Sequence, residues 1–358
     1  MTTRNITISL TMIVLLLFTA CDDDNPSGTT DEGFSEQVAT EILGNEAENV
    51  ILQTYTDLNT EAGQLKSDVE ALVNNQTSAN LDAAQEQWKA TRVPWESSES
   101  FLFGPVDTEG LDPALDSWPV NRTDLIGVLE SSDDLTPAFV DGLQGTLKGF
   151  HTIEFLLFGD GNSKTADDFT QRELDYLSAT TQVLKDDTQA LEDGWREDGG
   201  NFVDALAQAG NGSDVFTSQR AGIEILILGM DIIADEVANG KINDPLSQEN
   251  TTLVESQFSF NSKLDFQNNI RSIQAIYTGD MGSNSGPGIT DFVSEFDTDL
   301  DSRYKSEMEA AITAIGNIEG NFRDAITENP ESVQNAQDAV RTILQTIQED
   351  IRPLLNEF

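Results

Sequence analysis

Histidine and cysteine are almost absent from this chain of 358 residues, which contains one of each. The single histidine, His151, cannot supply the His-Glu-x-x-His arrangement of a zincin peptidase or the two histidines of a non-haem iron triad. The single cysteine, Cys21, excludes a disulfide bond within the chain. Any imidazole chemistry must therefore occur at His151.

Basic residues are also scarce, because 19 lysines and arginines face 64 aspartates and glutamates, for a formal net charge of -45. Removing residues 1–20 would change this charge to -46, since Arg4 is the only charged residue there. Such a field repels phosphate backbones and anionic lipids, so it argues against nucleic-acid binding and polybasic membrane docking. A solvated acidic surface explains most of the charge without any ligand, but attraction of cations remains open.

Long hydrophobic runs are confined to the N-terminus, where an apolar stretch follows Arg4 and is unbroken from Met12 to Phe18. The stretch is too short for a mature transmembrane helix and predicts a secretion signal over residues 1–20. Small residues directly before Cys21 resemble a bacterial lipobox, so we expect Cys21 to be the lipidated first residue of the mature protein. A buried or free thiol is the alternative.

Residues 21–34 contain few apolar side chains and predict a flexible tether. The three aspartates after Cys21 resemble the surface-export signal of lipoproteins in the Bacteroidetes type of envelope, although a solvated linker would look the same. We therefore expect a lipid-anchored protein of the bacterial cell envelope. Its expected place is the outer membrane, on the periplasmic face or at the cell surface.

Helical periodicity dominates the remaining sequence and strand-like alternation is scarce, which predicts an all-α fold. About 320 residues suit two domains better than one core. We expect helical-bundle domains at residues 35–198 and 214–358, joined by a hinge at 199–213. The expected helices are 35–73, 81–102, 135–158 and 171–196, then 217–238, 263–277, 289–317 and 330–356.

Two segments, 150–160 and 270–280, resemble each other without gaps and share three identical positions. Where the first has His151 and Glu154, the second has arginine and glutamine. A duplication of one bundle would explain the similarity, with the chemistry kept only in the first copy. A chance match between apolar-rich segments is the alternative.

His151 falls in the middle of an expected helix, and Glu154 follows three residues later. That spacing places the two side chains next to each other on one helix face. A neutral nitrogen and a carboxylate can then converge on one ion or proton. The structural alternative is a histidine satisfied by a neighbouring acid at the edge of a core.

The expected helix 81–102 carries a mixed aromatic and charged face. Its members, at spacings of four, three and four, are Trp88, Arg92, Trp95 and Glu99. Glu96 lies within one turn of both Arg92 and Glu99, so two carboxylates can meet on this helix. A plain Arg92–Glu99 ion pair between aromatic rings would give the same pattern. Pro94 should bend the helix, and a long loop from Gly104 to about Asp134 follows.

An ordered set of motifs resembles the imelysin family and extends from about Ser35 to Phe358. The motifs are Arg92-Val-Pro-Trp95, Ser98-Glu99, Phe103-Gly-Pro105, Leu115-Asp-Ser-Trp-Pro119, Gly149-Phe-His-Thr-Ile-Glu154, Asn239-Gly-Lys-Ile242 and Phe266-Gln-Asn-Asn-Ile270 running on to Gly279. The Gly-x-His-x-x-Glu pattern is short, so the order of the whole set carries the resemblance.

The resemblance implies a two-domain helical fold in an exported or lipid-anchored bacterial protein associated with iron regulation or uptake. Members were named as peptidases, and the His-x-x-Glu pair was taken as metal ligands. Transferred residue by residue, the pair is His151 and Glu154, and the matching pocket positions are Arg92, Glu99 and Asp116. Relatives in ferrous-iron uptake use carboxylates on the facing helix, which would be Glu96 and Glu99 here.

A site made of these residues would be rich in oxygen. Such a ligand set suits iron, manganese or calcium better than zinc, although one histidine and two carboxylates leave a weak zinc site open. The expected metal ligands are His151, Glu154, Glu99 and Glu96. Trp95, Ser98, Arg92 and Asp116 are expected to contact a bound ligand.

Our leading hypothesis is an envelope lipoprotein that binds a metal ion, iron foremost, or a small iron-bearing ligand, and that serves iron uptake. One alternative is a metal-dependent peptidase in which Glu154 or Glu99 acts as general base. Another is a metal-free module that holds a peptide or an anionic ligand through Arg92 and His151. No feature of the sequence identifies an uptake partner.

Overall fold

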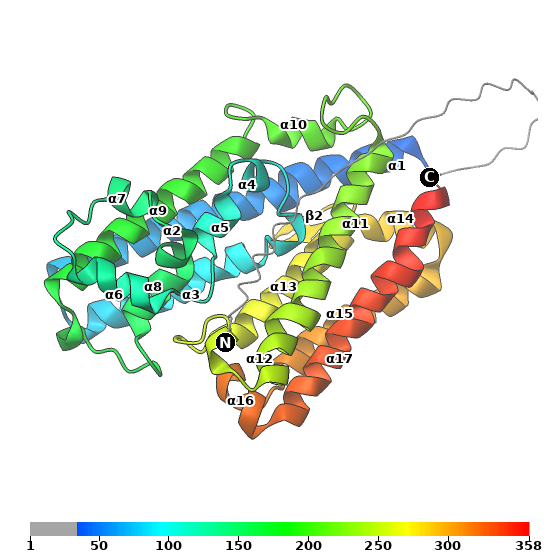
Figure 1. Ribbon diagram of the computed structural model, residues 1–358. Helices are drawn as coiled ribbons and strands as arrows, with labels where there is room; N and C mark the ends of the chain where they lie inside the picture. Colours follow the sequence, from blue (N-terminus) through cyan, green and yellow to red (C-terminus); the bar gives the residue numbers. More distant parts are fainter. Residues whose placement is uncertain (1–33, 358) are drawn as a thin grey trace, which may run out of the picture. The chain divides into compact units, whose positions relative to one another are not determined.

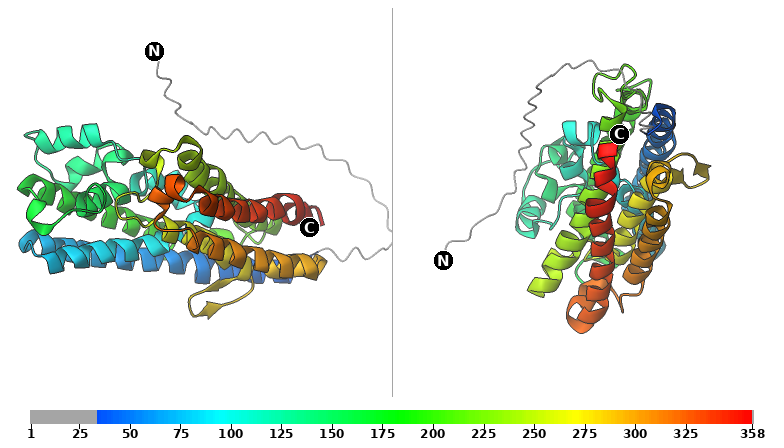
Figure 2. Two further views of the ribbon diagram at one scale, coloured as in Figure 1. Left: turned by 90° about the horizontal axis from the view of Figure 1, so that it is seen from below. Right: turned by 90° about the vertical axis from the view of Figure 1, so that its right-hand side faces the viewer.

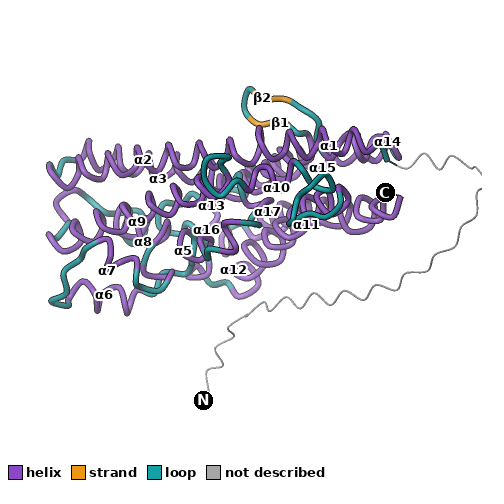
Figure 3. The backbone as a smooth tube through the Cα atoms, turned by 90° about the horizontal axis from the view of Figure 1, so that it is seen from above, coloured by secondary structure: helices purple, strands orange, loops and turns teal. Residues whose placement is uncertain are grey.

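The computed structural model describes residues 34–357, and these are largely helical (Figure 1). The all-α fold is confirmed. Within the described range the two strands are β1 (Asp280–Met281) and β2 (Asn284–Ser285), which pair antiparallel in a small hairpin beside the helices (Figure 3). The predicted signal peptide, Cys21 and the tether up to residue 33 lie outside the described residues.

The first half of the described chain contains nine α-helices, a π-helical segment and three short 3-10 turns. In order they are α1 (Glu36–Asn45), η1 (Glu46–Ile51), α2 (Leu52–Asn74), α3 (Ser78–Glu96), η2 (Glu99–Phe101), α4 (Pro105–Thr108), α5 (Leu111–Leu115), α6 (Arg122–Glu130), α7 (Pro137–Asp141), η3 (Gly145–Leu147), α8 (Gly149–Phe158), η4 (Ala166–Asp168) and α9 (Gln171–Trp195).

The second half adds eight α-helices, and two further π-helical segments, η5 and η7, extend α11 and α17. The elements are α10 (Phe202–Ala207), α11 (Gln219–Asp235), η5 (Glu236–Ile242), α12 (Asn243–Gln248), η6 (Thr251–Leu253), α13 (Ser262–Thr278), α14 (Ile289–Phe296), α15 (Thr298–Gly316), α16 (Phe322–Glu328), α17 (Pro330–Thr346), η7 (Ile347–Ile351) and η8 (Arg352–Glu357).

Local sequence signals explain where the long helices begin and which face they bury. Helix α9 starts at a capping box, in which the Thr170 hydroxyl accepts from the Glu173 backbone N–H and the Glu173 carboxylate accepts from the Thr170 N–H. Leu177, Leu184 and Leu191 recur every seven residues and are fully buried. The apolar face of α9 is therefore committed to the core by sequence alone.

Two groups of neighbouring helices form the scaffold. Helix α2 packs along α3 and α9, and α8 packs on α3 and α9, whereas α11, α13, α15 and α17 pack in sequence against one another (Figures 1 and 2). In residues 34–357, no helix is both long and apolar enough to cross a membrane.

Helices from the two halves also pack directly on each other. Helix α1 contacts α11 and α14, α3 contacts α13, and η2 contacts both α11 and α13. Phe34, the last residue of the predicted tether, is buried against the ring of Phe292 at a centroid distance of 4.9 Å. The proposed domain boundaries stay a prediction, but α1 clearly packs against helices of the second half.

Several predicted helix boundaries were wrong. The expected helix 135–158 is broken into α7, η3 and α8, because Gly142 and Gly145 interrupt it and Gly149 takes a positive φ of 72°. The expected loop 104–134 contains the short helices α4, α5 and α6. Helix 289–317 is divided at Asp297, whose side chain caps α15.

The two similar segments both end a helix at a glycine with positive φ, 65° at Gly159 and 72° at Gly279. Glycine adopts this conformation without a Cβ penalty. Helix α8 has 10 residues, whereas α13 has 17. The shared helix end explains part of the sequence similarity, and duplication stays a prediction.

Candidate functional site

The start of helix α8 brings His151 against the loop that carries Asp116. A Cβ atom on Gly149 would lie 2.2 Å from the Leu115 carbonyl oxygen, and the glycine has a φ of 72°. Only glycine tolerates both conditions. His151 therefore lies in the first turn of α8 and not in the middle of a longer helix, and the glycine of the Gly-x-His-x-x-Glu pattern has a steric role.

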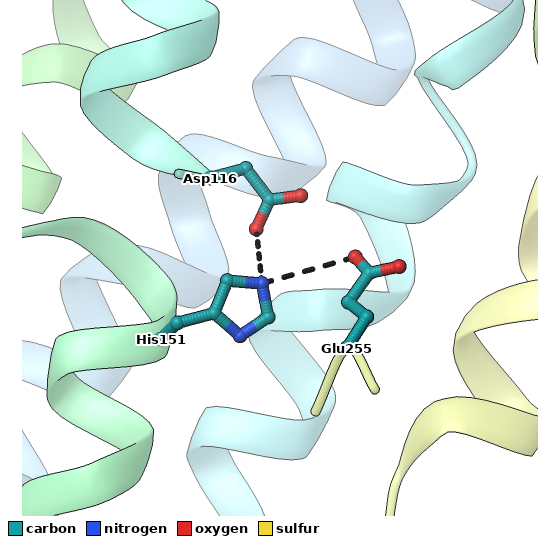
Figure 4. Close-up of side chains that lie close together, drawn as sticks. All are labelled: Asp116, His151 and Glu255. Carbon is teal, nitrogen blue, oxygen red and sulfur yellow. Dashed lines mark ion pairs between the residues drawn. The ribbon is translucent and has the colours of Figure 1, made fainter. Parts of the chain in front are cut away.

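His151 is 2% exposed and lies between three carboxylates (Figure 4 draws two of them). Its Nε2 is 3.1 Å from Asp116 Oδ1 and 3.8 Å from Glu255 Oε1, and its Nδ1 is 3.2 Å from Glu154 Oε2. Burial lowers the pKa of the imidazole, but Asp116 and Glu154 outweigh that effect and raise it to about 9. His151 is therefore an imidazolium at neutral pH.

Glu154 is engaged at both oxygens. Oε1 accepts from the backbone N–H groups of Phe258 (2.9 Å) and Ser259 (2.8 Å) and from the Ser259 hydroxyl (2.7 Å). Oε2 contacts His151 Nδ1. A carboxylate that holds one ring nitrogen fixes the imidazole so that the other nitrogen faces the site. Glu154 therefore orients His151, and Nε2 points towards Asp116 and Glu255.

Arg92 is a fully buried guanidinium in the middle of the acids. It donates to Asp116, to Glu96 and, at 2.7 Å, to Glu255 Oε1, and its Nε lies 3.7 Å from Asp265. The guanidinium carbon also lies 5.0 Å from the centre of the Phe150 ring. Burial works against the charge, but these carboxylates raise the pKa of Arg92 above its usual range.

Asp116 is the shared partner of the first-half side chains. Its Oδ2 accepts from Trp95 Nε1 at 2.7 Å, while Oδ1 faces Arg92 and His151. Burial alone would raise the pKa of this carboxyl, but Arg92 and His151 hold it well below its usual range. Asp116 is therefore ionised throughout the physiological range.

Lys241 enters the cluster from η5. Its buried Nζ lies 3.2 Å from Glu255, 3.6 Å from Glu96, 3.7 Å from Glu99 and 3.9 Å from Glu236. Burial disfavours the ammonium, but the surrounding carboxylates raise the pKa of Lys241 above its usual range. Burial also disfavours the charged form of Glu99, which raises the pKa of this carboxyl, and the positive charge of Lys241 only partly offsets the increase.

Two sets of ligand atoms converge closely enough to hold one metal ion each. One set is Asp116, His151 and Glu255, and the other is Glu96, Glu99 and Asp116; within each set the atoms lie within 4.8 Å of one another. His151 Nε2 and Glu255 Oε2 are buried and have no aligned hydrogen-bond partner within residues 34–357. A donor set of one nitrogen and several carboxylate oxygens fits iron, manganese or calcium.

A pocket of about 250 Å³ lies beside these sets. Its charged lining is entirely acidic and consists of Glu99, Asp112, Asp116 and Glu236. Trp118 lines the same pocket, and its ring centre is 6.1 Å from that of His151. A cation approaching through this pocket would meet carboxylates before it reached the buried basic groups.

The structure brings most of the predicted site residues together, with two differences on the α3 side. Helix α3 ends at Glu96, so Glu99 lies in the following 3-10 turn and not on one continuous helix face. Pro94 lies in the last turn of α3. The Ser98 hydroxyl donates to the Trp95 carbonyl at 2.6 Å, so it contacts the backbone and not the acids.

Sequence reasoning missed four contributors from the second half, which are Lys241, Glu255, Asp265 and Asn269. Asn269 donates to Glu96 Oε2 at 2.5 Å. Lys241 and Asn269 fall within motifs that carried the family resemblance and could have been flagged there. Glu255 lies in a non-helical loop with positive φ at Ser256 (51°) and Phe260 (62°), where no periodic pattern marks a buried face.

The Imelysin family model matches residues 51–349. The chain belongs to the imelysin family. Among proteins similar to this imelysin-family chain is "Iron-regulated protein A" of Synechococcus elongatus, which is 28% identical and covers 96% of this chain and 91% of its own length.

Solved structures agree with this family. A crystal structure titled as an iron-regulated protein A precursor from Parabacteroides distasonis has a TM-score of 0.82 and 27% identity, over 91% of this chain and 96% of that chain. An imelysin-like protein from Psychrobacter arcticum has a TM-score of 0.75 over 90% of this chain and 97% of that chain. At 14% identity, the second comparison establishes the shared fold only.

Proposed function

We propose that this imelysin-family protein binds a metal ion, iron foremost, at the carboxylate cluster around Asp116. The observation that carries the proposal is that Asp116 belongs to both convergent ligand sets, beside His151 Nε2 and an acid-lined pocket. The names of two relatives, which call them iron-regulated, support iron as the first candidate. A small iron-bearing ligand could enter through the same pocket.

The proposed ligand set differs from the one expected from sequence. Asp116, Glu255 and His151 would hold the ion, with the metal taking the place of the proton on His151 Nε2, and Glu96 and Glu99 offer a second set that shares Asp116. Glu154 serves as the partner of His151 Nδ1, since three donors already occupy its other oxygen. The bound ion would supply a Lewis-acid centre, and its neighbours would position it.

A metal-free site for an anionic ligand fits the geometry poorly. Arg92 already contacts four carboxylates, those of Asp116, Glu96, Glu255 and Asp265. An anionic ligand would have to displace some of these carboxylates to reach the guanidinium. The charged lining of the adjacent pocket is acidic and would repel the anion. The charge of the site therefore favours a cation.

We propose in addition that Cys21 is lipidated and that the protein is anchored in the bacterial cell envelope, at the outer membrane. The support is the apolar N-terminal run and the small residues directly before Cys21. Labelling of growing cells with a fatty-acid analogue should mark the wild-type chain and leave Cys21→Ala unmarked. Labelling that persists in the variant would contradict the proposal.

Calorimetric titration tests the metal proposal directly. We expect wild-type protein to bind Mn²⁺, or Fe²⁺ without oxygen, at one saturable site, and Asp116→Asn to weaken binding at least about tenfold, or 1.4 kcal/mol. Asp116→Asn removes a charge from both ligand sets. Asp133→Asn, which changes an exposed aspartate, should bind like wild type.

Flat titrations of wild type with Fe²⁺, Mn²⁺, Ca²⁺ and Zn²⁺ would contradict metal binding. The same metal-loaded samples should be incubated with a denatured polypeptide. Cleavage activity that stays with the wild-type protein through purification, and that is lost in His151→Gln and Glu154→Gln, would favour the peptidase alternative over simple binding.

A further inference from the structure

Lys241 lies where the carboxylates of both ligand sets meet. It contacts Glu96 and Glu99 of one set and Glu255 of the other, and its side chain is completely buried. A fourth carboxylate, Glu236, lies 3.9 Å away. The ammonium thus occupies a position that attracts any small cation.

The distances distinguish Lys241 from Arg92, which is also buried among these carboxylates. Arg92 makes close hydrogen bonds to three carboxylates and lies near the rings of Trp88 and Phe150, so it is held in place. Lys241 donates one long hydrogen bond, to Glu255 Oε1 at 3.4 Å, and its Nζ lies 5.4 Å from the centre of the Trp118 ring. Its ion-pair distances of 3.2 to 3.9 Å exceed the usual ammonium–carboxylate hydrogen-bond length of about 2.7–2.9 Å. Of the two cations, Lys241 has weaker contacts to lose.

We propose that Lys241 is the resident counter-ion of the metal site, and that a divalent cation enters by displacing its ammonium from Glu96, Glu99 and Glu255. Glu236 is 38% exposed, lines the acidic pocket and lies on the same helical segment. Glu236 can therefore pair with the displaced ammonium at the mouth of the site. This inference rests on the proposed function and concerns how the same site is regulated.

Displacement has a consequence for selectivity. A monovalent ion merely exchanges one positive charge for another, whereas a divalent ion adds a charge among the same carboxylates. The lysine therefore favours divalent over monovalent cations and sets a threshold concentration for metal binding. Removal of its charge should lower that threshold.

Titration with Mn²⁺ of wild type, Lys241→Met and Lys305→Met tests the proposal. Lys241→Met should bind at least about tenfold more tightly than wild type. Lys305→Met is the matched control, because Lys305 is a 43% exposed lysine with one carboxylate, Asp301, at 3.1 Å, and it should bind like wild type.

If wild type binds Mn²⁺ and Lys241→Met binds it equally well or more weakly, displacement of Lys241 is overturned and the proposed function stays intact. Binding by Lys241→Met alone would show that the ammonium blocks the site in the native chain, and it would overturn both displacement and metal binding by the native chain. Binding by neither protein would overturn both.

A measurement on wild type covers the case in which Lys241→Met does not fold. An amine-reactive reagent, followed by peptide mass spectrometry, should label Lys241 little without metal, since the side chain is 0% exposed. Labelling should rise at least severalfold in protein saturated with Mn²⁺, and labelling of Lys305 should stay constant. Continued protection of Lys241 in metal-saturated protein would overturn the proposal.

Discussion

Glu46 is a buried carboxyl group whose two oxygens have no hydrogen-bond partner in the described part of the chain. Burial raises the pKa of Glu46 well above its ordinary value, and the nearby charge of Asp280 adds to the shift. In the unfolded chain the same group ionises near its ordinary pKa. The folded state therefore loses stability relative to the unfolded state as pH rises above that value.

Glu46→Gln should raise the melting temperature at pH 7.5 by a few degrees, corresponding to about 1–3 kcal/mol, because the amide carries no ionisation penalty. The gain should be much smaller at pH 4, where the wild-type side chain is largely protonated in both states. Thermal unfolding followed by circular dichroism at both pH values measures the difference. Glu48→Gln is the control, since Glu48 is exposed two residues later.

A gain that is equal at both pH values would contradict the assigned burial penalty. It would indicate that the substitution acts through packing or helix propensity.

His151 shows how far residue-level sequence reasoning reached. Its uniqueness excluded a zincin site, and the spacing to Glu154 correctly placed the two side chains in contact. The spacing could not show that Glu154 orients His151 while His151 Nε2 faces the site, because the donors to Glu154 come from residues more than 100 positions away. Non-local hydrogen bonds leave no local pattern.

At the scale of elements, the junction between α5 and α8 positions the site. Gly149 allows the first turn of α8 to approach the Leu115 carbonyl, one residue before Asp116. The sequence predicted one helix over 135–158 because apolar residues continue across the break. Backbone glycines, and not hydrophobic spacing, decided where α8 begins.

Gly149→Ala should lower the free energy of unfolding by more than about 2 kcal/mol, because it adds a positive-φ penalty to a steric clash. It should also weaken Mn²⁺ binding by moving His151 away from Asp116. Chemical denaturation and titration give the two readouts.

Gly110→Ala separates the penalty of a positive φ from the effect of the steric clash. Gly110 has a similar φ of 68°, but no described residue places an atom within 4 Å of an added Cβ. It should cost only about 1 kcal/mol and leave metal binding unchanged. An equal cost for both variants would contradict the steric role of Gly149.

At the scale of the whole described chain, the site is assembled from both halves. Asp116 and His151 come from the first half, whereas Glu255 and Lys241 come from the second. Away from the site, the two halves are also held together by the packing of α1 on α11. A Cβ on Gly222 of α11 would lie 2.6 Å from the side chain of Leu43 in α1. Site geometry and packing between the halves should therefore be coupled.

Gly222→Val should overpack this contact and destabilise the fold by about 1–3 kcal/mol. It should also reduce Mn²⁺ affinity, although Gly222 is not a proposed ligand. Denaturant unfolding monitored by tryptophan fluorescence, with titration at low temperature, measures both effects.

Gly44→Val in α1 is the matched control, since no atom of the described chain lies within 4 Å of its added Cβ. It should leave unfolding and binding close to wild type. Loss of stability in Gly222→Val with unchanged metal affinity would show that the two halves are not coupled through this contact.

The sequence by itself determined the all-α class, the imelysin resemblance and the limits on chemistry. Helical class follows from short-range periodicity, and a single histidine bounds the nitrogen ligands whatever the fold. Tertiary structure alone decided that Glu255 and Lys241 join the site, that Glu154 orients His151 and that Glu99 leaves the α3 face. Those outcomes depend on loop geometry and on packing between segments far apart in the chain, which local spacing does not encode.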